Sequence, residues 1–335
     1  MEIHLKKRDI FLSKDNTDCL KGIFSIFVLF HHIRAQMLCF NDTVIGMLLT
    51  ALGYLSVGVF LFLSGYGLEV QYQKNGREYI DKMPFYRIIP FYFICIFSIL
   101  LYVIERLLLG ITFNAKDVLQ SFIFGHTIVQ NGWYLQAIIV IYILYYVAYR
   151  FEGKQKKWIV LLVLLGVYCL VCMLFKLPIT YYESILGFPV GIFVAQNKNA
   201  ICEFLLEKNV WIRSVIYLVL FGVTLVLGNY HMLKKEAAIG FKMVSVVFFI
   251  LITLLIAYHI SFVNKITKWL GKRYCEIYII QGLFISALHS TGLYIKNDWV
   301  YFIMVVILTI ISASVLRPIF NTIMLSCRKV LLIKM

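Results

Sequence analysis

The sequence has little of what a water-soluble protein needs. Only 15% of its 335 residues are charged, whereas 61% are apolar and the mean hydropathy is +0.86. Soluble domains have about 25% charged and about 45–50% apolar residues. A soluble globular fold is therefore excluded, since so much apolar side chain cannot be hidden from water. Each membrane span takes roughly 20 residues, so the chain has room for a helical membrane domain and short loops, but not for a separate soluble domain.

A cysteine pattern typical of a disulfide framework, internal repeats and Pro- or Ser-rich linkers are also missing. Cys169 and Cys172 form a C-x-x-C motif, but the sequence has no second pair and no histidine near it, so we expect plain packing rather than a redox or metal site. No cluster of His, Asp and Glu has ligand spacing, and no metal is expected.

Ten apolar runs predict ten membrane-spanning helices. They cover about residues 19–39, 44–66, 84–104, 132–149, 158–175, 181–196, 211–228, 240–260, 274–290 and 299–325. The expected fold is an all-α polytopic membrane protein, in which a single bundle over residues 19–325 follows a segment at 1–18 and precedes a tail at 326–335. The first run lacks a cleavage site and is too long for a signal-peptide core, so we expect it to remain as a helix.

Acidic residues are outnumbered, with 17 Asp and Glu against 32 Lys and Arg and a net charge of +15. If the N-terminus is cytoplasmic, ten spans place all but eight of the basic residues on the cytoplasmic side. The exceptions are Arg34, Arg106, Lys116, Lys176, Lys234, Lys235, Lys242 and Lys296. This bias predicts a cell-membrane protein with both termini in the cytoplasm. The excess positive charge suits anionic lipid headgroups, and no nucleic-acid partner is expected.

Ionisable residues inside the apolar runs are few, and each is a functional candidate because charge is costly in a bilayer. Lys21 and His32 are 11 residues apart, which puts them on one helical face at a separation of about 16 Å. A histidine can act as a general base near neutral pH. His31 points about 100° away from His32, and periodicity leaves open which of the two faces the bundle.

Small and basic residues mark two further places. Gly58, Ser64, Gly65 and Gly67 close the second run, where they favour close helix packing or a broken helix. Arg87, just after Pro84, suits either a phosphate-bearing cytoplasmic ligand or the general positive-inside bias. Gly187 and Gly191 form a G-x-x-x-G pair that packs helices within or between chains.

These segments, in this order, resemble the acyltransferase 3 family of integral membrane acyltransferases. The family's opening motif is matched by Lys21, Gly22 and His32, and its second-helix motif by 53–66, ending in Ser64-Gly-Tyr. Arg87-Ile-Ile-Pro90, Trp133-Tyr-Leu135 and the segment 270–278 are similar to three later motifs. The resemblance extends from about residue 15 to 325.

The resemblance implies an enzyme that transfers an acyl group, usually acetyl from cytoplasmic acyl-CoA, to a hydroxyl of a cell-envelope carbohydrate or exopolysaccharide. Acyl-CoA is then a donor substrate and no permanently bound cofactor is expected. On this analogy His32 is the catalytic base, and Lys21, Lys82 and Arg87 bind the donor. We expect Glu183 or Glu276 to orient His32, and Ser64, Trp133, Tyr134 and Tyr278 to contact substrate. Trp133 and Tyr134 also suit an interfacial aromatic belt.

Two departures from the family pattern bear on donor binding. Pro84 stands where many members have a basic residue, with Lys82 the nearest substitute, and Gln281 stands where a histidine often ends the late motif. They keep open a sensor or scaffold with a degenerate acyltransferase fold. The other alternative is a polytopic transporter or flippase for an envelope glycan precursor, although no repeated halves are visible. The acceptor, which a lipid could carry, and the oligomeric state are not specified by the sequence.

Overall fold

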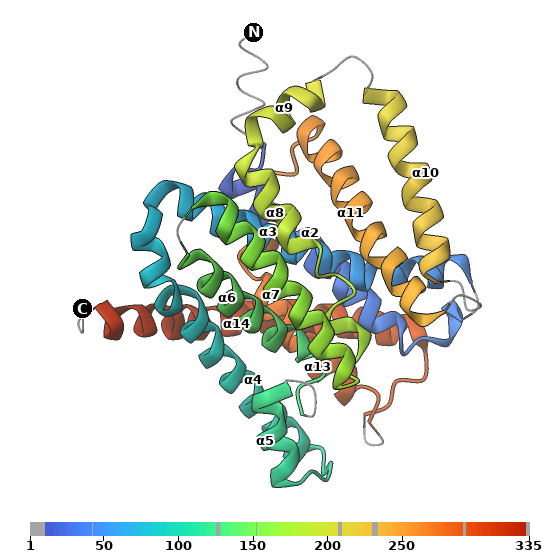
Figure 1. Ribbon diagram of the computed structural model, residues 1–335. Coiled ribbons are helices and arrows are strands. Elements are labelled where there is room, and N and C mark those ends of the chain that lie inside the picture. The colour runs from blue at the N-terminus through green and yellow to red at the C-terminus, as the bar shows by residue number, and fades with distance from the viewer. Residues whose placement is uncertain are drawn as a thin grey trace. The chain divides into compact units, whose positions relative to one another are not determined.

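The computed structural model describes residues 11–41, 43–124, 128–151, 153–206, 210–229, 234–290 and 293–332. Within these residues the chain is helical and contains no β-strand, which confirms the predicted all-α polytopic class (Figure 1). Five helical stretches are long and apolar enough to cross a membrane: Val44–Leu108, Gln155–Leu174, Val210–Gly228, Lys235–His259 and Asp298–Ser326. Shorter apolar helices occupy Trp133–Tyr149, Gly187–Gln196 and Tyr274–Ala287.

The helix bounds follow the predicted runs with a few shifts. Helix α2 (Lys14–Arg34) ends before residue 39, and α3 (Val44–Met83) continues well past residue 66. The other helices in the apolar runs are α4 (Ile89–Leu108), α6 (Trp133–Tyr149), α7 (Lys154–Leu174), α8 (Gly187–Gln196), α10 (Val210–Gly228), α11 (Lys235–His259), α13 (Tyr274–Ala287) and α14 (Asp298–Leu332). Helices α5 (Ala115–Phe124), α9 (Lys198–Leu206) and α12 (Lys265–Gly271), with the short turns η1 (Leu38–Phe40), η2 (Pro84–Ile88) and η3 (Ile179–Tyr181), were not predicted.

The chain divides into two compact units that share α2 and α3. Residues 1–31, 44–74 and 176–274 form the first unit, and residues 32–43, 75–175 and 275–335 form the second. The division in α3 falls beside Gly76, whose backbone is not helical (φ 58°, ψ −140°). Glycine adopts this left-handed φ at no steric cost, so the helix changes course there.

In the first unit, α10 and α11 lie side by side, and α11 also packs on α8 and α9 (Figure 1). Small residues let α3 and α8 approach closely. A Cβ on Gly187 would clash with the carbonyl oxygen of Gly58, and a Cβ on Gly191 would clash with that of Phe62. The G-x-x-x-G pair therefore packs α8 on α3 within the chain.

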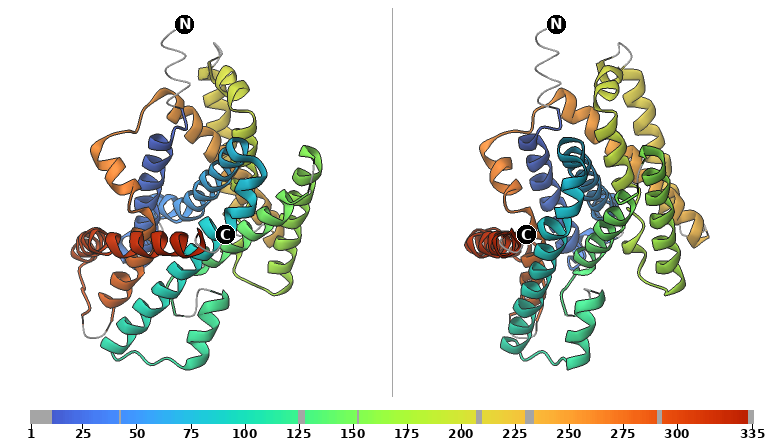
Figure 2. Two further views of the ribbon diagram at one scale, coloured as in Figure 1. Left: turned by 90° about the vertical axis from the view of Figure 1, so that its left-hand side faces the viewer. Right: turned by 60° about the vertical axis from the view of Figure 1, so that its left-hand side comes forward.

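In the second unit, α4 is the central helix, and it contacts α5, α6, α14 and the turn η2. Figure 2 shows α5 turning back from the end of α4, and α14 crossing beside α4. Helices α6 and α7 pack along each other. One end of this unit is fixed by charge, since Asp81 of α3 pairs with both Arg77 and Arg150 at 3.4 and 3.1 Å.

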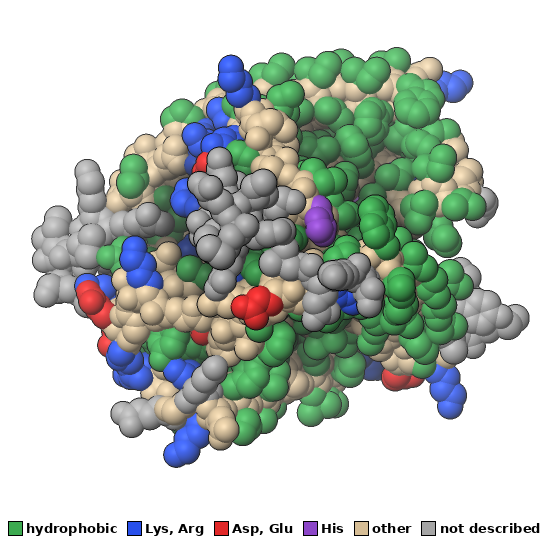
Figure 3. All heavy atoms as spheres, turned by 90° about the horizontal axis from the view of Figure 1, so that it is seen from above, with side chains coloured by type: hydrophobic (Ala, Val, Ile, Leu, Met, Phe, Trp, Pro, Cys, Tyr) green, Lys and Arg blue, Asp and Glu red, His purple; other side chains and the backbone are tan. Residues whose placement is uncertain are grey.

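Apolar side chains cover much of the surface in Figure 3, among scattered basic and acidic groups. Helix α10 is an example, because only 11% of its most apolar window is buried and Trp211 is 83% exposed. A water-facing helix would place polar residues there, whereas hydrocarbon accepts apolar ones on every exposed side. The surface agrees with a protein that sits in a membrane.

Candidate functional site

The motif around Gly22 and the late motif that contains Gly271 meet in the first unit. Gly22 of α2 lies so close to Leu270 and Gly271 that a Cβ on it would clash with both. A Cβ on Gly271 would in turn clash with the carbonyl oxygen of Asp18. The glycines therefore serve close backbone contact between α2 and α12, which fixes the start of α2 against the segment that leads into α13.

Lys21 lies at this junction and is already engaged by neighbours. Its Nζ is 3.0 Å from Oδ1 of Asp18 and 5.5 Å from the centre of the Tyr274 ring. Tyr274 also stacks on Phe60 of α3 at a centroid distance of 6.1 Å. Lys21 keeps 26% of its side chain exposed, so it can still meet a ligand from solution.

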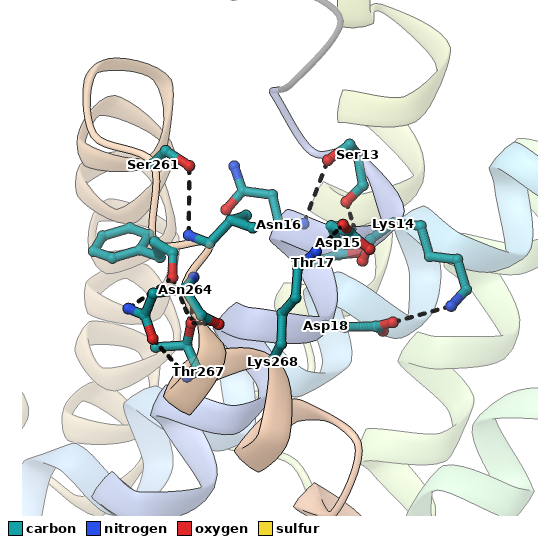
Figure 4. Close-up of polar contacts among 12 residues, drawn as sticks. Ser13, Lys14, Asp15, Asn16, Thr17, Asp18, Ser261, Asn264, Thr267 and Lys268 are labelled. Atoms are coloured by element: carbon teal, nitrogen blue, oxygen red, sulfur yellow. Dashed lines mark hydrogen bonds and ion pairs between the residues drawn. The ribbon is translucent and has the colours of Figure 1, made fainter.

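A second set of polar contacts holds the first turn of α2 to α12 (Figure 4). Lys268 donates to the carboxylate of Asp15, and Asn264 caps α12 by accepting from the backbone N–H of Thr267 at 2.9 Å. Asp15 and Lys268 are both exposed. Hydrogen bonding and charge attraction from Lys268 lower the pKa of Asp15 below 3.8, and the same hydrogen bond raises the pKa of Lys268 above 10.5.

The two adjacent histidines of α2 have different surroundings. Nδ1 of His31 lies 3.1 Å from the carbonyl oxygen of Leu49, and a Cβ on Gly53 would lie 2.6 Å from Nε2 of the same ring. His31 thus packs on α3 in the first unit. His32 is half-buried and belongs to the second unit, with the segment that runs on to Gln36. Lys21 and His32 both lie within the continuous helix α2, as their spacing predicted.

The two predicted carboxylates each hold a basic partner. In the first unit, Oε2 of Glu183 is 3.1 Å from Nζ of Lys242, which also lies over the ring of Tyr54. In the second unit, Oε1 of Glu276 is 2.7 Å from a guanidinium nitrogen of Arg317. Glu276 is fully buried, so Arg317 supplies the opposite charge that a buried carboxylate needs. The sequence predicts Lys242 on the outer side of the membrane, and its ion pair with Glu183 has no signal in the sequence.

Arg87 lies in an unusual turn of the second unit. Residues Pro84–Ile88 form a π-helical turn, η2, between α3 and α4. Such turns are rare and occur often at functional sites, because they shift the register of the side chains that follow. Arg87 is half-buried within this turn. Lys82, just before the turn, is paired with Glu78 at 2.6 Å.

Three of the four predicted substrate residues come together in the second unit. The rings of Tyr134 and Tyr278 meet at a centroid distance of 5.4 Å, and Trp133 contacts Tyr134 edge to face. The hydroxyl of Tyr278 donates to the carbonyl oxygen of Asn131 at 2.6 Å. The fourth residue, Ser64, lies half-buried on α3 in the first unit and is not part of this aromatic group.

A cavity of about 380 Å³, here called the polar pocket, opens among helix ends of the second unit. Tyr102, Ile128 and Ile285 form its apolar wall. Its polar lining comes from the turn after α2, the end of α4, the turn before α6, and the end of α13 with the turn after it, and consists of Gln36, Glu105, Arg106, Gln130, Ser286 and His289.

The polar pocket includes one residue of the segment that directly follows α2. This residue is Gln36, four residues after His32, and its backbone N–H donates to the carbonyl oxygen of Ile33 at 3.0 Å. Arg87 lies in the turn η2 just before α4, and Glu105 lies near the far end of α4, 16 residues or about 24 Å from Ile89 along that helix. The second unit therefore holds a basic turn near one end of α4 and a polar cavity near the other.

Sequence reasoning missed the polar pocket for an identifiable reason. Glu105 and Arg106 fall at the edge of the third apolar run, where charged residues are usual. Gln36 and Gln130 carry no charge, so the cost of charge in a bilayer does not single them out. Their location in the predicted topology could have indicated the pocket. All these residues lie at span ends that a ten-span topology places on the same side of the membrane.

Comparison with known proteins gives one match. A family model described as an acyltransferase domain matches residues 15–317. No curated protein and no solved structure matches the chain. The matched region begins at the first turn of α2 and ends at Arg317, the partner of Glu276.

Proposed function

The chain belongs to the acyltransferase 3 family of membrane acyltransferases, and from this premise we propose that it moves an acetyl group from cytoplasmic acetyl-CoA to a hydroxyl of a cell-envelope carbohydrate. The observation that carries the proposal is the family match over residues 15–317, within which His32 lies half-buried on the continuous helix α2. Gln36, four residues after His32 in the chain, lines the polar pocket, and we assign the hydroxyl of a sugar in this pocket as the group from which His32 takes a proton.

In the proposed reaction, His32 takes the proton of the acceptor hydroxyl as the oxygen attacks the thioester carbonyl of acetyl-CoA. The C–S bond then breaks, the new ester forms, and the CoA thiolate recovers the proton from the imidazolium. No group is oxidised or reduced, and His32 returns to its neutral form. Glu183 or Glu276 stays the predicted carboxylate that orients His32, in addition to the ion pair that it makes with Lys242 or Arg317.

Donor binding is assigned to basic residues near the predicted cytoplasmic surface. Arg87 is the strongest, because a guanidinium in a π-helical turn can bind a phosphate with two parallel hydrogen bonds. To bind a donor phosphate, Lys82 would break its ion pair with Glu78, and Lys21 would break its ion pair with Asp18. Trp133, Tyr134 and Tyr278, whose rings form one contacting group, stay predicted substrate contacts, and so does Ser64.

The test is acetyl transfer by the full-length protein in lipid nanodiscs, with acetyl-CoA labelled in the acetyl group and envelope carbohydrate from a strain that lacks the gene. We expect wild-type protein to label the carbohydrate and His32→Ala to lower the rate by roughly 10²–10⁴-fold, the usual contribution of a general base. His259→Ala is the matched control, since this exposed histidine at the end of α11 lies in the other unit.

Two results would contradict the proposal. Equal loss of activity in His259→Ala and His32→Ala would point to a general effect of removing a histidine. Movement of a glycan precursor across the membrane without consumption of acetyl-CoA would instead support a transporter, the competing class.

A further inference from the structure

The chemistry of the polar pocket suits a saccharide. It offers a carboxylate (Glu105), two amides (Gln36 and Gln130) and a hydroxyl (Ser286), which are the groups that donate to and accept from sugar hydroxyls. Gln130 has a buried side-chain oxygen with no hydrogen-bond partner within the described residues. A buried carbonyl oxygen of this kind costs free energy until a donor reaches it, and a ligand hydroxyl would supply one.

An apolar groove of about 280 Å³ lies beside the polar pocket, on α4 and α13. Apart from Glu105 it is lined only by apolar residues, among them Ile104 and Leu108 of α4 and Leu283, Phe284 and Ala287 of α13. Ile104 is 52% and Leu108 81% exposed, so the groove lies at the surface of the helices. In a membrane this surface faces hydrocarbon.

Glu105 lines both the polar pocket and the apolar groove, so the two are neighbours on one surface of the second unit. We propose that the acceptor is a saccharide carried on a membrane lipid, with its sugar in the polar pocket and its hydrocarbon chain in the apolar groove. The inference rests on the proposed function for the role of the bound sugar as acceptor, but the binding itself can be tested separately.

A lipid-borne sugar fits better than a soluble one for a physical reason. A soluble saccharide would fill the polar pocket alone and would have to be captured from dilute solution. A lipid keeps the sugar at the depth of the pocket and raises its local concentration, as any tether does. The groove adds little hydrophobic free energy, because lipid tails are as apolar as leucine. It contributes an open path for the chain, which a bulky side chain would block.

The experiment compares the native lipids that stay with the full-length protein when membrane patches are extracted by polymer without detergent. Glycolipid is measured by mass spectrometry relative to phospholipid. Leu108→Trp places an indole in the groove, and Leu107→Trp is the matched control, because Leu107 is the neighbouring exposed leucine and lines neither cavity. Gln130→Leu removes a polar group from the pocket but leaves the groove open.

We expect wild type and Leu107→Trp to retain glycolipid. Leu108→Trp and Gln130→Leu should retain roughly tenfold less, which corresponds to about 1.4 kcal/mol of binding free energy. Equal glycolipid in all four proteins overturns the proposal, and so does wild type without enriched glycolipid. The mass of the enriched lipid shows whether the sugar is joined through glycerol or through phosphate.

Measuring glycolipid binding and acetyl transfer on the same proteins separates this inference from the proposed function. If wild-type protein retains glycolipid but transfers no acetyl group, the lipid site is supported and the acyltransferase proposal is contradicted. Acetyl transfer to a soluble saccharide, with no glycolipid bound, would do the reverse. Under both proposals His32→Ala keeps the glycolipid and loses transfer.

Discussion

At the scale of single residues, the adjacent histidines of α2 differ in what surrounds them. His31 fills the space above Gly53 and bonds the carbonyl oxygen of Leu49, whereas His32 is half-buried and belongs to the second unit. We expect His31→Ala to lower the free energy of unfolding by roughly 1–2 kcal/mol, through the lost hydrogen bond and the space it leaves. Transfer per folded molecule should change little. Thermal unfolding and specific activity of the purified protein check both parts, and a fall in specific activity as large as that of His32→Ala would assign the base role to His31.

The ion pair of Glu276 and Arg317 gives a second prediction at this scale. Arg317→Met leaves a fully buried carboxylate without its cation, which costs roughly 3–5 kcal/mol. Glu276→Gln should cost less, because Arg317 is 33% exposed and can reach other partners. The double variant should recover part of the loss, and thermal unfolding of the four proteins measures this. If Arg317→Met proves no less stable than Glu276→Gln, burial of the carboxylate does not govern the pair.

At the scale of elements, small residues decide how α3 and α8 pack. Gly187→Ala forces a methyl group onto the carbonyl of Gly58, and we expect a loss of roughly 1–3 kcal/mol. Gly222→Ala in α10 is the control, since a Cβ there meets nothing within 4 Å. That change should be neutral or stabilising by up to about 1 kcal/mol, because alanine favours the helix. Equal unfolding temperatures for the two variants would argue against close packing of α8 on α3.

The contact between α2 and α12 should depend on pH. The pKa of Asp15 is lowered by Lys268, so this ion pair contributes stability above the unfolded pKa of about 3.8 and loses it as the pH falls through the lower folded value. Wild type and Asp15→Asn should therefore differ at neutral pH and converge in acid. Both groups are exposed, so the difference should be small and should shrink with salt. Hydrogen exchange of α12 across this pH range measures it, and a gap that persists in acid would exclude the ion pair as its cause.

At the scale of the whole molecule, ten spans with a cytoplasmic N-terminus predict on which side each loop lies. Lys74 should be cytoplasmic and Lys116 external, and both are exposed. In a variant without native cysteines, a membrane-impermeant maleimide should label Lys116→Cys in intact cells and Lys74→Cys only after permeabilisation. Labelling of both before permeabilisation, or of Lys74→Cys alone, would overturn this topology and the assignment of donor and acceptor sides.

The sequence by itself determined the class of the molecule. Apolar runs of sufficient length require a membrane, and hydrogen bonding inside hydrocarbon then requires helices, so the all-α polytopic fold followed from composition and run length. The spacing of Lys21 and His32 followed from helical geometry alone. These properties depend on residues that are close together in the sequence, so they can be predicted without knowledge of the tertiary contacts.

Only the tertiary structure decided which distant residues meet. It paired Glu183 with Lys242 and Glu276 with Arg317, set Gly22 against Gly271, and gathered Gln36, Glu105, Gln130 and Ser286 around one cavity. None of these contacts has a periodic signal in the sequence, because each joins separate helices whose rotation is fixed by packing. The polar pocket exists because several helix ends come together, and its individual residues would each pass as ordinary loop or interface positions.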